Sequence, residues 1–270
     1  MRAYVLTYHS GNIAGNDGAS NDLAALSRDL DWLHGERIPI TPLRQIVDAL
    51  LEGRTDGLPA RVAAITLDDG LDFDFVDLVH PFHGPQRSAD TILREFSRRH
   101  AAPAHATSFV IASPDARRQI ARCEMLDYQW IGEHWWAAAA ASGRFHLGSH
   151  SWDHLSPSVS PVAQRDGKTG SFRWVTTFAD AERQVRAAHD YLAARAPNPG
   201  AALLAYPYGD ASAYLVDDYL PAHGVRGGTI AAFTTGSLPV HAGSPRWRLP
   251  RFTCGTDWRS PEDLAALFRA

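Results

Sequence analysis

The sequence predicts an α/β barrel, a parallel sheet with helices outside it, and three observations support this fold class. Short apolar runs alternate with amphipathic helical patterns about seven times along the 270 residues. The first run leads into Y-H-S-G-N, whereas an open nucleotide-binding sheet would place a glycine-rich phosphate loop there. Neither an internal repeat nor a Pro/Gly-rich linker divides the chain, so we expect a single domain over residues 1–270.

Seven apolar runs have the length and the content of β-branched and aromatic residues that buried strands show. We expect these strands at residues 3–8, 62–67, 106–112, 144–149, 202–206, 229–234 and 247–252. Helical patterns lie between them, at residues 22–33, 42–51, 88–99, 131–141, 178–196 and 211–223. The clearest helix is 178–196, which follows a start signal at Thr177 and Asp180 and carries one apolar stripe of Ala181, Val185, Ala188 and Leu192.

Two long segments between these elements are expected to be loops, at residues 71–87 and 156–176. In a barrel, the loops that follow the strands carry most of the substrate contacts. If both loops fold over the site they would admit only a small molecule, whereas an open groove would admit a polymer.

Composition excludes several classes of function. The net charge of -4 and the scattered Lys and Arg residues give no basic patch, so no nucleic-acid partner is expected. Cys123 and Cys254 lie far apart in the sequence, which argues against a disulfide framework or a thiolate metal site, and we expect two buried thiols. The first apolar run is too short for a signal peptide and no later run reaches transmembrane length, so a cytoplasmic protein without a membrane partner is expected.

The segment F-H-L-G-S-H-S-W-D-H-L at 145–155 holds two pairs of histidines four residues apart. With 13 histidines in the chain such pairs arise by chance, so a pair alone is weak evidence for a metal site. In a strand, His146 and His150 would lie roughly 13 Å apart, whereas residues four apart in a turn or helix lie about 5–6 Å from each other. Because a strand is expected to end at 149, His150 and His154 are the ligand candidates and His146 is expected in the barrel wall.

A second polar group follows the strand expected at 62–67, in I-T-L-D-D-G at 65–70. Asp-Gly is a common reversal signal, and a plain turn would explain the motif taken alone. However, the carboxyl ends of barrel strands share one rim, which would bring Asp68 and Asp69 to His150 and His154. Two imidazoles and one carboxylate leave a position for water, as in hydrolytic zinc sites. Asp69 would be the third ligand, and Asp68 the base that takes a proton from the water.

Three motifs in order resemble those of the polysaccharide deacetylase family, also called carbohydrate esterase family 4 or the NodB-homology domain: T-L-D-D-G at 66–70, H-S-W-D-H at 150–154 and A-Y-P-Y-G at 205–209. The resemblance runs from L-T-Y-H at 6–9 to L-P-R-F at 249–252. It implies a distorted (β/α)7 barrel and metal-dependent hydrolysis of an N- or O-acetyl group, usually on an N-acetylated sugar. It also implies the same roles for the two aspartates and two histidines. The expected metal is Zn²⁺, with Co²⁺ or Ni²⁺ as alternatives.

The resemblance further implies that the backbone N–H of Tyr208 holds the oxyanion, although Tyr208 could equally be a packing aromatic. Many members of the family carry an arginine that steadies the base at the position where this chain has Ala205. Arg251 is the expected substitute, with Arg248 as the second choice and surface solvation as the alternative for both.

The family's usual general acid is a histidine near the C-terminus, and no histidine follows His241 in this chain. His9, at the end of the first expected strand, is the first choice to replace it, because that rim position points it into the same site and L-T-Y-H resembles the deacetylases of poly-N-acetylglucosamine. His241, in a loop, is the second choice.

Other aromatic and histidine residues have two interpretations. His80 and His83 could bind a second metal, but loop packing is favoured because no third ligand is evident. Trp135 and Trp136 are adjacent on an expected helix and favour core packing, whereas Trp152 lies inside the metal motif and is a candidate for stacking on a sugar ring.

Three functions remain open at this point. The first is a metal-dependent de-N-acetylase that acts on an acetylated carbohydrate. The second keeps the fold and the metal but hydrolyses a small amide, a cyclic imide or an O-acetyl ester. The third is a sugar-binding protein without turnover, which Ala205 and the missing C-terminal histidine would favour.

Overall fold

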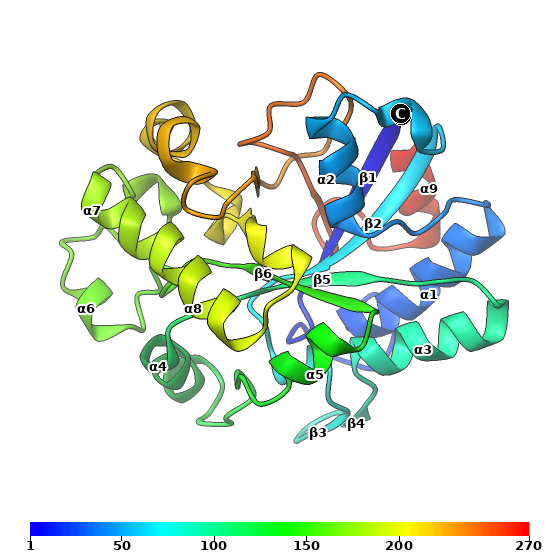
Figure 1. The fold of residues 1–270 in the computed structure, drawn as a ribbon. Helices are drawn as coiled ribbons and strands as arrows, with labels where there is room; N and C mark the ends of the chain where they lie inside the picture. Colours follow the sequence, from blue (N-terminus) through cyan, green and yellow to red (C-terminus); the bar gives the residue numbers. More distant parts are fainter. Residues whose placement is uncertain (270) are drawn as a thin grey trace.

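A computed structural model describes residues 1–269, which form one curled parallel sheet surrounded by helices (Figure 1). The sheet has the order β8-β7-β6-β5-β2-β1-β9. Its strands are β1 (Arg2–Tyr8), β2 (Arg61–Leu67), β5 (Ala106–Val110), β6 (Phe145–Ser149), β7 (Leu203–Ala205), β8 (Ala231–Phe233) and β9 (Phe252–Thr253). All neighbouring strands pair in parallel. The distorted seven-stranded α/β barrel expected from the sequence is therefore confirmed.

The segment before β9 closes the barrel. Leu249 pairs with Phe233 of β8, and three residues later Phe252 pairs with Leu6 of β1. The expected strand at 247–252 is thus divided between the two edges of the sheet, and only its end is regular strand. This division places Arg251 between the two edges of the sheet.

Helices cover the outside of the sheet. They are α1 (Asp22–Gly35), α2 (Leu43–Leu51), α3 (Ala89–His100), α4 (Pro114–Glu124), α5 (Trp136–Ala141), α6 (Ser160–Ala163), α7 (Phe178–Ala181), α8 (Ala188–Arg195) and α9 (Pro261–Arg269). A π-helical stretch, Glu182–Ala187, joins α7 to α8, and a second one spans Tyr214–Gly224. Within residues 1–269, none of these helices combines the length and the apolar content needed to cross a bilayer.

Local chemistry explains where several helices begin. The Asn21 side chain accepts hydrogen bonds from the first N–H groups of α1, and Ser88 does the same for α3. The helix expected at 131–141 begins only at Trp136, because the N–H of Gly132 and the indole of Trp135 both donate to Asp72 and hold the preceding residues in an irregular loop. The sequence had not indicated α4, α9 or the hairpin of β3 (Leu78–His80) and β4 (Gly84–Gln86).

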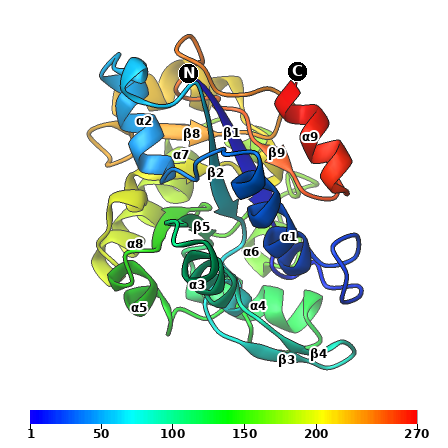
Figure 2. The ribbon, with the colours of Figure 1, turned by 90° about the vertical axis from the view of Figure 1, so that its right-hand side faces the viewer.

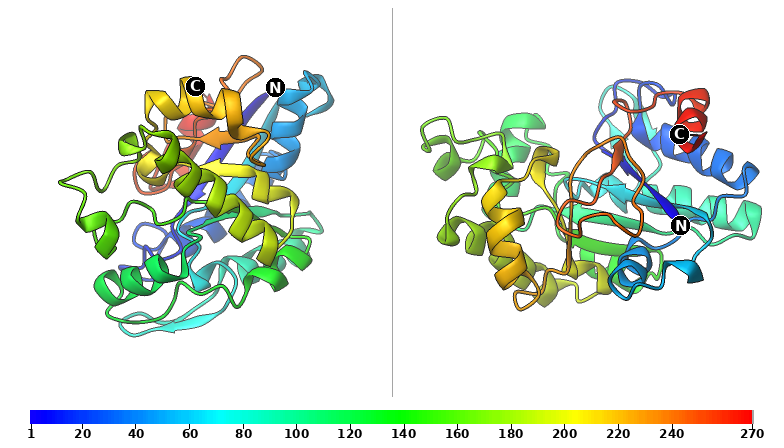
Figure 3. Two further views of the ribbon diagram at one scale, coloured as in Figure 1. Left: turned by 60° about the vertical axis from the view of Figure 1, so that its left-hand side comes forward. Right: turned by 90° about the horizontal axis from the view of Figure 1, so that it is seen from above.

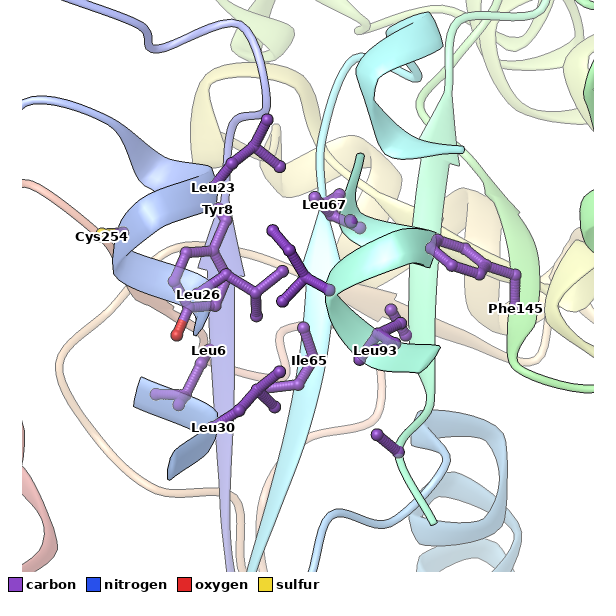
Figure 4. Packing of buried hydrophobic residues seen from close by; sticks show 14 of the residues in the cluster. Leu6, Tyr8, Leu23, Leu26, Leu30, Ile65, Leu67, Leu93, Phe145 and Cys254 are labelled. Atoms are coloured by element: carbon purple, nitrogen blue, oxygen red, sulfur yellow. The ribbon is translucent and has the colours of Figure 1, made fainter. Parts of the chain in front are cut away.

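The core between the sheet and its outer helices is built from alternating strand residues and one face of each helix. Leu23, Leu26 and Leu30 of α1 pack toward β1 and β2, as Figure 4 shows. The strands themselves are buried on both faces, as their nearly continuous apolar sequence predicts. Cys254 is buried as expected, but Cys123 is exposed.

The two ends of the barrel differ. The N-terminus and α9 lie at one end, and the β3–β4 hairpin projects at the other (Figure 2). The left-hand view of Figure 3 shows the same arrangement, with both termini at the top. Because β1 begins at the first end, the hairpin lies at the end where the parallel strands finish. Residues that follow the strands therefore gather at this end of the barrel.

Candidate metal centre and active site

Three side chains from two strand ends converge on one point. Asp69 follows β2, while His150 and His154 follow β6. Asp69 Oδ1 lies 3.7 Å from His150 Nε2 and 3.5 Å from His154 Nε2. One donor atom from each of the three residues lies within 4.8 Å of the others. One carboxylate oxygen and two imidazole nitrogens thus face a common centre.

The turn after β2 aims Asp69 at this centre. Asp69 and Gly70 both have left-handed backbone angles, with φ of 73° and 71°. A Cβ atom at Gly70 would lie 2.6 Å from a methyl group of Val110, so only glycine fits where the turn passes β5. Both carboxylates approach His150, with Asp68 Oδ2 at 3.9 Å and Asp69 Oδ1 at 3.7 Å from its Nε2, but only Asp69 also lies within 4.0 Å of His154.

A hydrogen bond fixes the tautomer of His150. Its Nδ1 lies 2.9 Å from the carbonyl oxygen of Ala205 on the neighbouring β7. A carbonyl only accepts, so Nδ1 carries the proton, and Nε2 is left as the atom that can bind a metal ion. Ala205 therefore contributes its backbone carbonyl to the site.

His154 reaches the same centre through a compact turn. Its N–H donates to Ser151 Oγ, and both residues have left-handed backbone angles. The rings of His150 and His154 lie 4.9 Å apart, centroid to centroid. Burial, and then the neighbouring His150, lower the pKa of His154 to about 4, so this ring is neutral and able to ligate at neutral pH.

Asp68 lies beside the three ligand candidates and pairs with Arg251. The pair is bidentate, with Nη1–Oδ1 and Nη2–Oδ2 distances of 2.7 Å each. Burial alone would raise the pKa of Asp68, but the Arg251 guanidinium and then His150 outweigh it and hold that pKa well below the usual carboxyl range. The buried arginine enters from the segment that closes the barrel, whereas Arg248, the second choice, is exposed.

The structure separates the two candidates for the general acid. His9 follows β1 and lines the same cavity as the three ligand candidates. Its backbone N–H donates to Asp22, and its buried Nδ1 meets no hydrogen-bond partner among residues 1–269. His241 follows Val240, which pairs with Ala3 near the start of β1. His241 therefore lies at the opposite end of the barrel and cannot reach the site.

The cavity above the cluster of Asp69, His150 and His154 has a volume of about 540 Å³. Tyr208 lines it, and the Tyr208 ring lies 4.5 Å from that of His154. The backbone of Tyr208 is left-handed, with φ of 61°, at the turn that follows β7. The far wall carries hydroxyl and carboxylate groups that the sequence had not indicated: Thr235, Ser237, Thr253, Thr256 and Asp257.

The expectation that Trp152 lines the site is wrong. Its ring packs edge-on against Tyr191, with centroids 5.7 Å apart, and it lines neither this cavity nor the neighbouring one. The chain between the two histidines has a left-handed backbone at Ser151, and the Trp152 ring lies on the side of Tyr191. Trp135 and Trp136 are core residues, as expected.

His80 and His83 stack on each other in the β3–β4 hairpin, with ring centroids 4.9 Å apart. Over residues 1–269, the cluster of Asp69, His150 and His154 is the one group of three or more candidate ligands, so the histidine pair has no third ligand.

A buried carboxyl beneath the site was not singled out from the sequence. Asp74 accepts hydrogen bonds from the hydroxyls of Ser10, at 2.5 Å, and Ser108, at 2.6 Å. Burial raises the pKa of Asp74 to about 7, against the effect of both hydroxyls. Asp74 thereby ties the segment after β1, which carries His9, to β5. In the sequence it is hidden in D-F-D-F-V-D, which resembles an ordinary acidic loop.

The donor set fits a divalent transition metal. Two imidazoles and one carboxylate are the ligands that catalytic zinc takes in hydrolases, with a further coordination position left for water. The bond from Nδ1 of His150 to Ala205 leaves Nε2 of that ring as its ligand atom, and the neutral ring of His154 supplies a lone pair without a proton to displace. The 540 Å³ cavity borders all three donors, so this centre is accessible to a small ligand.

Comparisons with known proteins show the fold. No known family profile and no curated protein matches the sequence. Solved structures do match over their full length. The deacetylase PplD of Streptococcus pyogenes is 16% identical with a TM-score of 0.62, covering 99% of this chain and 98% of its own. A de-N-acetylase from Aggregatibacter actinomycetemcomitans is 13% identical with a TM-score of 0.65, and the match covers 99% of this chain and 100% of that one. IcaB from Ammonifex degensii is 18% identical with a TM-score of 0.63, and the match covers 100% of this chain and 97% of that one.

The chain thus has the fold of these deacetylases, which is the likeness that the three sequence motifs predicted.

Proposed function

We propose that the protein is a metal-dependent hydrolase that removes acetyl groups from an N-acetylated carbohydrate. One observation carries the proposal: a three-donor cluster of Asp69, His150 and His154 stands beside a separate carboxylate, Asp68, that a buried arginine keeps ionised. A ligand set and a free base in one cavity are what hydrolysis by activated water needs. The likeness to structures described as deacetylases supports the choice of the acetyl group.

Asp69, His150 and His154 would hold the metal. The ion, best matched by Zn²⁺, would supply Lewis acidity toward a water molecule and toward the acetyl carbonyl. Asp68 needs that contribution. Its ion pair with Arg251 keeps Asp68 ionised at neutral pH but also makes it a weak base. The proton that Asp68 accepts must therefore come from a water molecule that is unusually acidic.

The remaining roles fall to residues around the cavity. Water adds to the acetyl carbon while Asp68 accepts its proton. The backbone N–H of Tyr208 donates to the oxygen that becomes negative. His9 donates a proton to the leaving nitrogen as the C–N bond breaks, so that the products are acetate and a free amine. Asp22 and Asp74 hold the chain on either side of His9 and position it.

The experiment is acetate release by the metal-loaded protein. Purified protein is supplied with Zn²⁺, Co²⁺ or Ni²⁺ and assayed against N-acetylglucosamine oligomers, an alkyl acetate ester and small cyclic amides. Acetate from the acetylated sugars, with an equal amount of free amine, supports the proposal. Hydrolysis of the cyclic amides alone would replace it with the small-amide function. Sugar binding without turnover under any of the three metals would identify a binding protein.

A further inference from the structure

The two histidines of the proposed metal centre are held in different ways. His150 Nδ1 donates to the carbonyl of Ala205, 2.9 Å away, so the neighbouring strand orients its ring. Within residues 1–269, the ring of His154 has no such hydrogen bond, and its one polar contact is the carboxylate of Asp69. The position of His154 therefore depends on the turn that carries it.

This turn contains three residues with an unfavourable backbone. Ser151, His154 and Leu155 have φ of 71°, 60° and 45°. Residues other than glycine seldom adopt this left-handed conformation, which costs free energy that the surroundings must offset. In the first half of the turn, two N–H groups that follow β5 donate to the carbonyls of Ser151 and Trp152, at 3.0 and 2.8 Å. In the second half, which carries His154, the side chain of Asp153 provides a further support.

Asp153 joins the turn to a helix. Its side chain is buried, and Oδ1 accepts from the N–H of Leu155, at 3.0 Å, and from Nε2 of Gln184, at 2.8 Å. The Oε1 atom of Gln184 lies 3.4 Å from the N–H of Asp153, so the two residues form a reciprocal pair. A carboxylate only accepts, which fixes the orientation of the glutamine amide. Because Asp153 and Leu155 flank His154, these bonds hold the backbone on both sides of the ligand candidate.

Gln184 is fully buried in the π-helical stretch between α7 and α8. Over residues 1–269, both hydrogen bonds of its side chain go to Asp153. Burying an amide costs free energy unless it finds partners, and an apolar residue would serve packing alone without that cost. Stretches of π-helix occur mostly as short insertions in α-helices, frequently at functional sites. A glutamine at this position therefore indicates a specific task.

The same helix meets the turn at a second point. Trp152 packs edge-on against Tyr191 of α8, with ring centroids 5.7 Å apart. Tyr191 is itself fixed, because its hydroxyl donates to Glu133 at 2.8 Å and the guanidinium of Arg195 lies 3.5 Å from the centre of its ring. Two adjacent residues between the histidines, Trp152 and Asp153, thus rest on one helix.

We propose that Gln184 is a positioning residue of the metal centre, which holds the turn that aims His154 at the metal through its reciprocal pair with Asp153. This inference rests on the metal site of the proposed function and not on its substrate. Partners that hold the ligands from outside the ligand set tune metal binding, and changing one typically lowers metal affinity by about 10- to 100-fold. Gln184 lies outside the cavity at the cluster, so it acts through the turn and not by contact with substrate.

The test reverses the polarity of the pair. Gln184→Glu removes the donor and places a carboxylate against Asp153. Adding Asp153→Asn supplies a donor from the other side, while the asparagine oxygen still accepts from Leu155, so the double variant restores the pair. Asp153→Ala removes the pair, and Asp153→Asn alone keeps its acceptor. Gln86→Glu is the matched control, because Gln86 is buried, its Nε2 donates to Asn16 at 2.9 Å, and it lies outside the cavity at the cluster.

Two measurements report on the metal directly. Competition with a chelating dye gives the Kd for Zn²⁺, and the visible absorption of the Co²⁺-loaded protein reports the geometry of the ligands. Gln184→Glu and Asp153→Ala should each raise the Kd by about 10- to 100-fold and alter the Co²⁺ spectrum. The double variant should recover most of the affinity, and Asp153→Asn and Gln86→Glu should stay near the wild type.

Wild-type affinity in either Gln184→Glu or Asp153→Ala would overturn the proposal. A double variant that binds no tighter than Gln184→Glu would overturn it as well, since the loss would then come from general disruption around residue 184. Circular dichroism of the metal-free proteins checks that each variant folds. If Gln184→Glu does not fold, the comparison of Asp153→Ala with Asp153→Asn decides the matter.

The same experiment separates this inference from the proposed function. If the wild type binds Zn²⁺ but releases no acetate, and Gln184→Glu binds Zn²⁺ less tightly, the positioning role stands and the proposed activity fails. If the wild type deacetylates sugars and Gln184→Glu keeps its affinity for Zn²⁺, the activity stands and the positioning role fails. A wild-type protein that binds none of the metals contradicts both.

Discussion

Arg251 and Asp68 form a buried bidentate ion pair across the line where the barrel closes, with both N–O distances at 2.7 Å. The arginine side chain is fully enclosed. Removing one partner of such a pair leaves an uncompensated buried charge, which costs roughly 3–5 kcal/mol. We therefore expect Arg251→Ala to lower the free energy of unfolding by about that amount.

Denaturation by urea measures this loss. Arg248→Ala is the matched control, because Arg248 is exposed three residues earlier in the same segment. An Arg251→Ala protein as stable as the control would contradict the assigned ion pair.

Asp68→Asn should keep the metal and lose activity. The amide cannot accept a proton, and the loss of a general base costs about two to four orders of magnitude in rate. Elemental analysis measures the bound metal, and acetate release measures the rate. An Asp68→Asn protein with near wild-type turnover would remove Asp68 from its proposed role.

His150→Ala should lose stoichiometric metal, because it removes one of three donors. His146→Ala is the control, since His146 stands four residues earlier on β6 and lines a different cavity. Metal content after dialysis against trace Zn²⁺ distinguishes the two variants. Full metal retention by His150→Ala, or equal loss in both variants, would refute the ligand assignment.

Stability should fall in weak acid because of a second histidine pair, far from the proposed ligands. His105 is 7% exposed, its ring touches that of His146, and neither of its nitrogens has a hydrogen-bond partner among residues 1–269. Burial, and then His146, lower the pKa of His105 to about 3. In the unfolded chain His105 takes up a proton near pH 6.5, whereas in the folded protein it stays neutral until the pH is near 3. The unfolded state is therefore stabilised relative to the folded state as the pH falls from about 6.5 toward 3.

When the pH is lowered from 7 to 5, protonation of His105 in the unfolded chain should reduce the free energy of unfolding by about 2 kcal/mol. The measurement is the free energy of unfolding of the wild type and of His105→Leu at both pH values. The difference between the two proteins isolates His105 from other titrating groups. His134→Ala, whose side chain is 63% exposed, serves as the surface control. Parallel pH profiles for the wild type and His105→Leu would contradict the prediction.

The sequence predicted the barrel and the metal cluster because both depend on local signals. Buried parallel strands have continuous apolar sequences, and polar residues that follow them meet at one rim whatever the details of the fold. Asp69, His150 and His154 could therefore be placed together from two short motifs. Arg251 could be named because the family resemblance implies an arginine beside the base, and this chain has Ala205 at the usual position of that arginine.

The rest depends on contacts that no local pattern carries. Trp152 packs against Tyr191, a residue far along the sequence, and it follows a left-handed backbone at Ser151 that non-glycine residues seldom adopt. The loop after β2 meets a loop far along the sequence, where the ring of Phe73 packs edge-on against Trp130 and Asp72 is hydrogen-bonded to the backbone of Trp130 and Gly132. Asp74 is buried and accepts hydrogen bonds from the hydroxyls of Ser10 and Ser108. These two serines lie far from Asp74 in the sequence, so no local pattern indicates the contacts.

Anomalous diffraction from crystals grown with Zn²⁺ tests the central claim most directly. The account predicts one strong zinc peak about 2.0–2.2 Å from an oxygen of Asp69 and from Nε2 of both His150 and His154, with Asp68 outside bonding distance and still paired with Arg251. A peak bound by Asp68, or zinc only at other residues while these three side chains point apart, would contradict it.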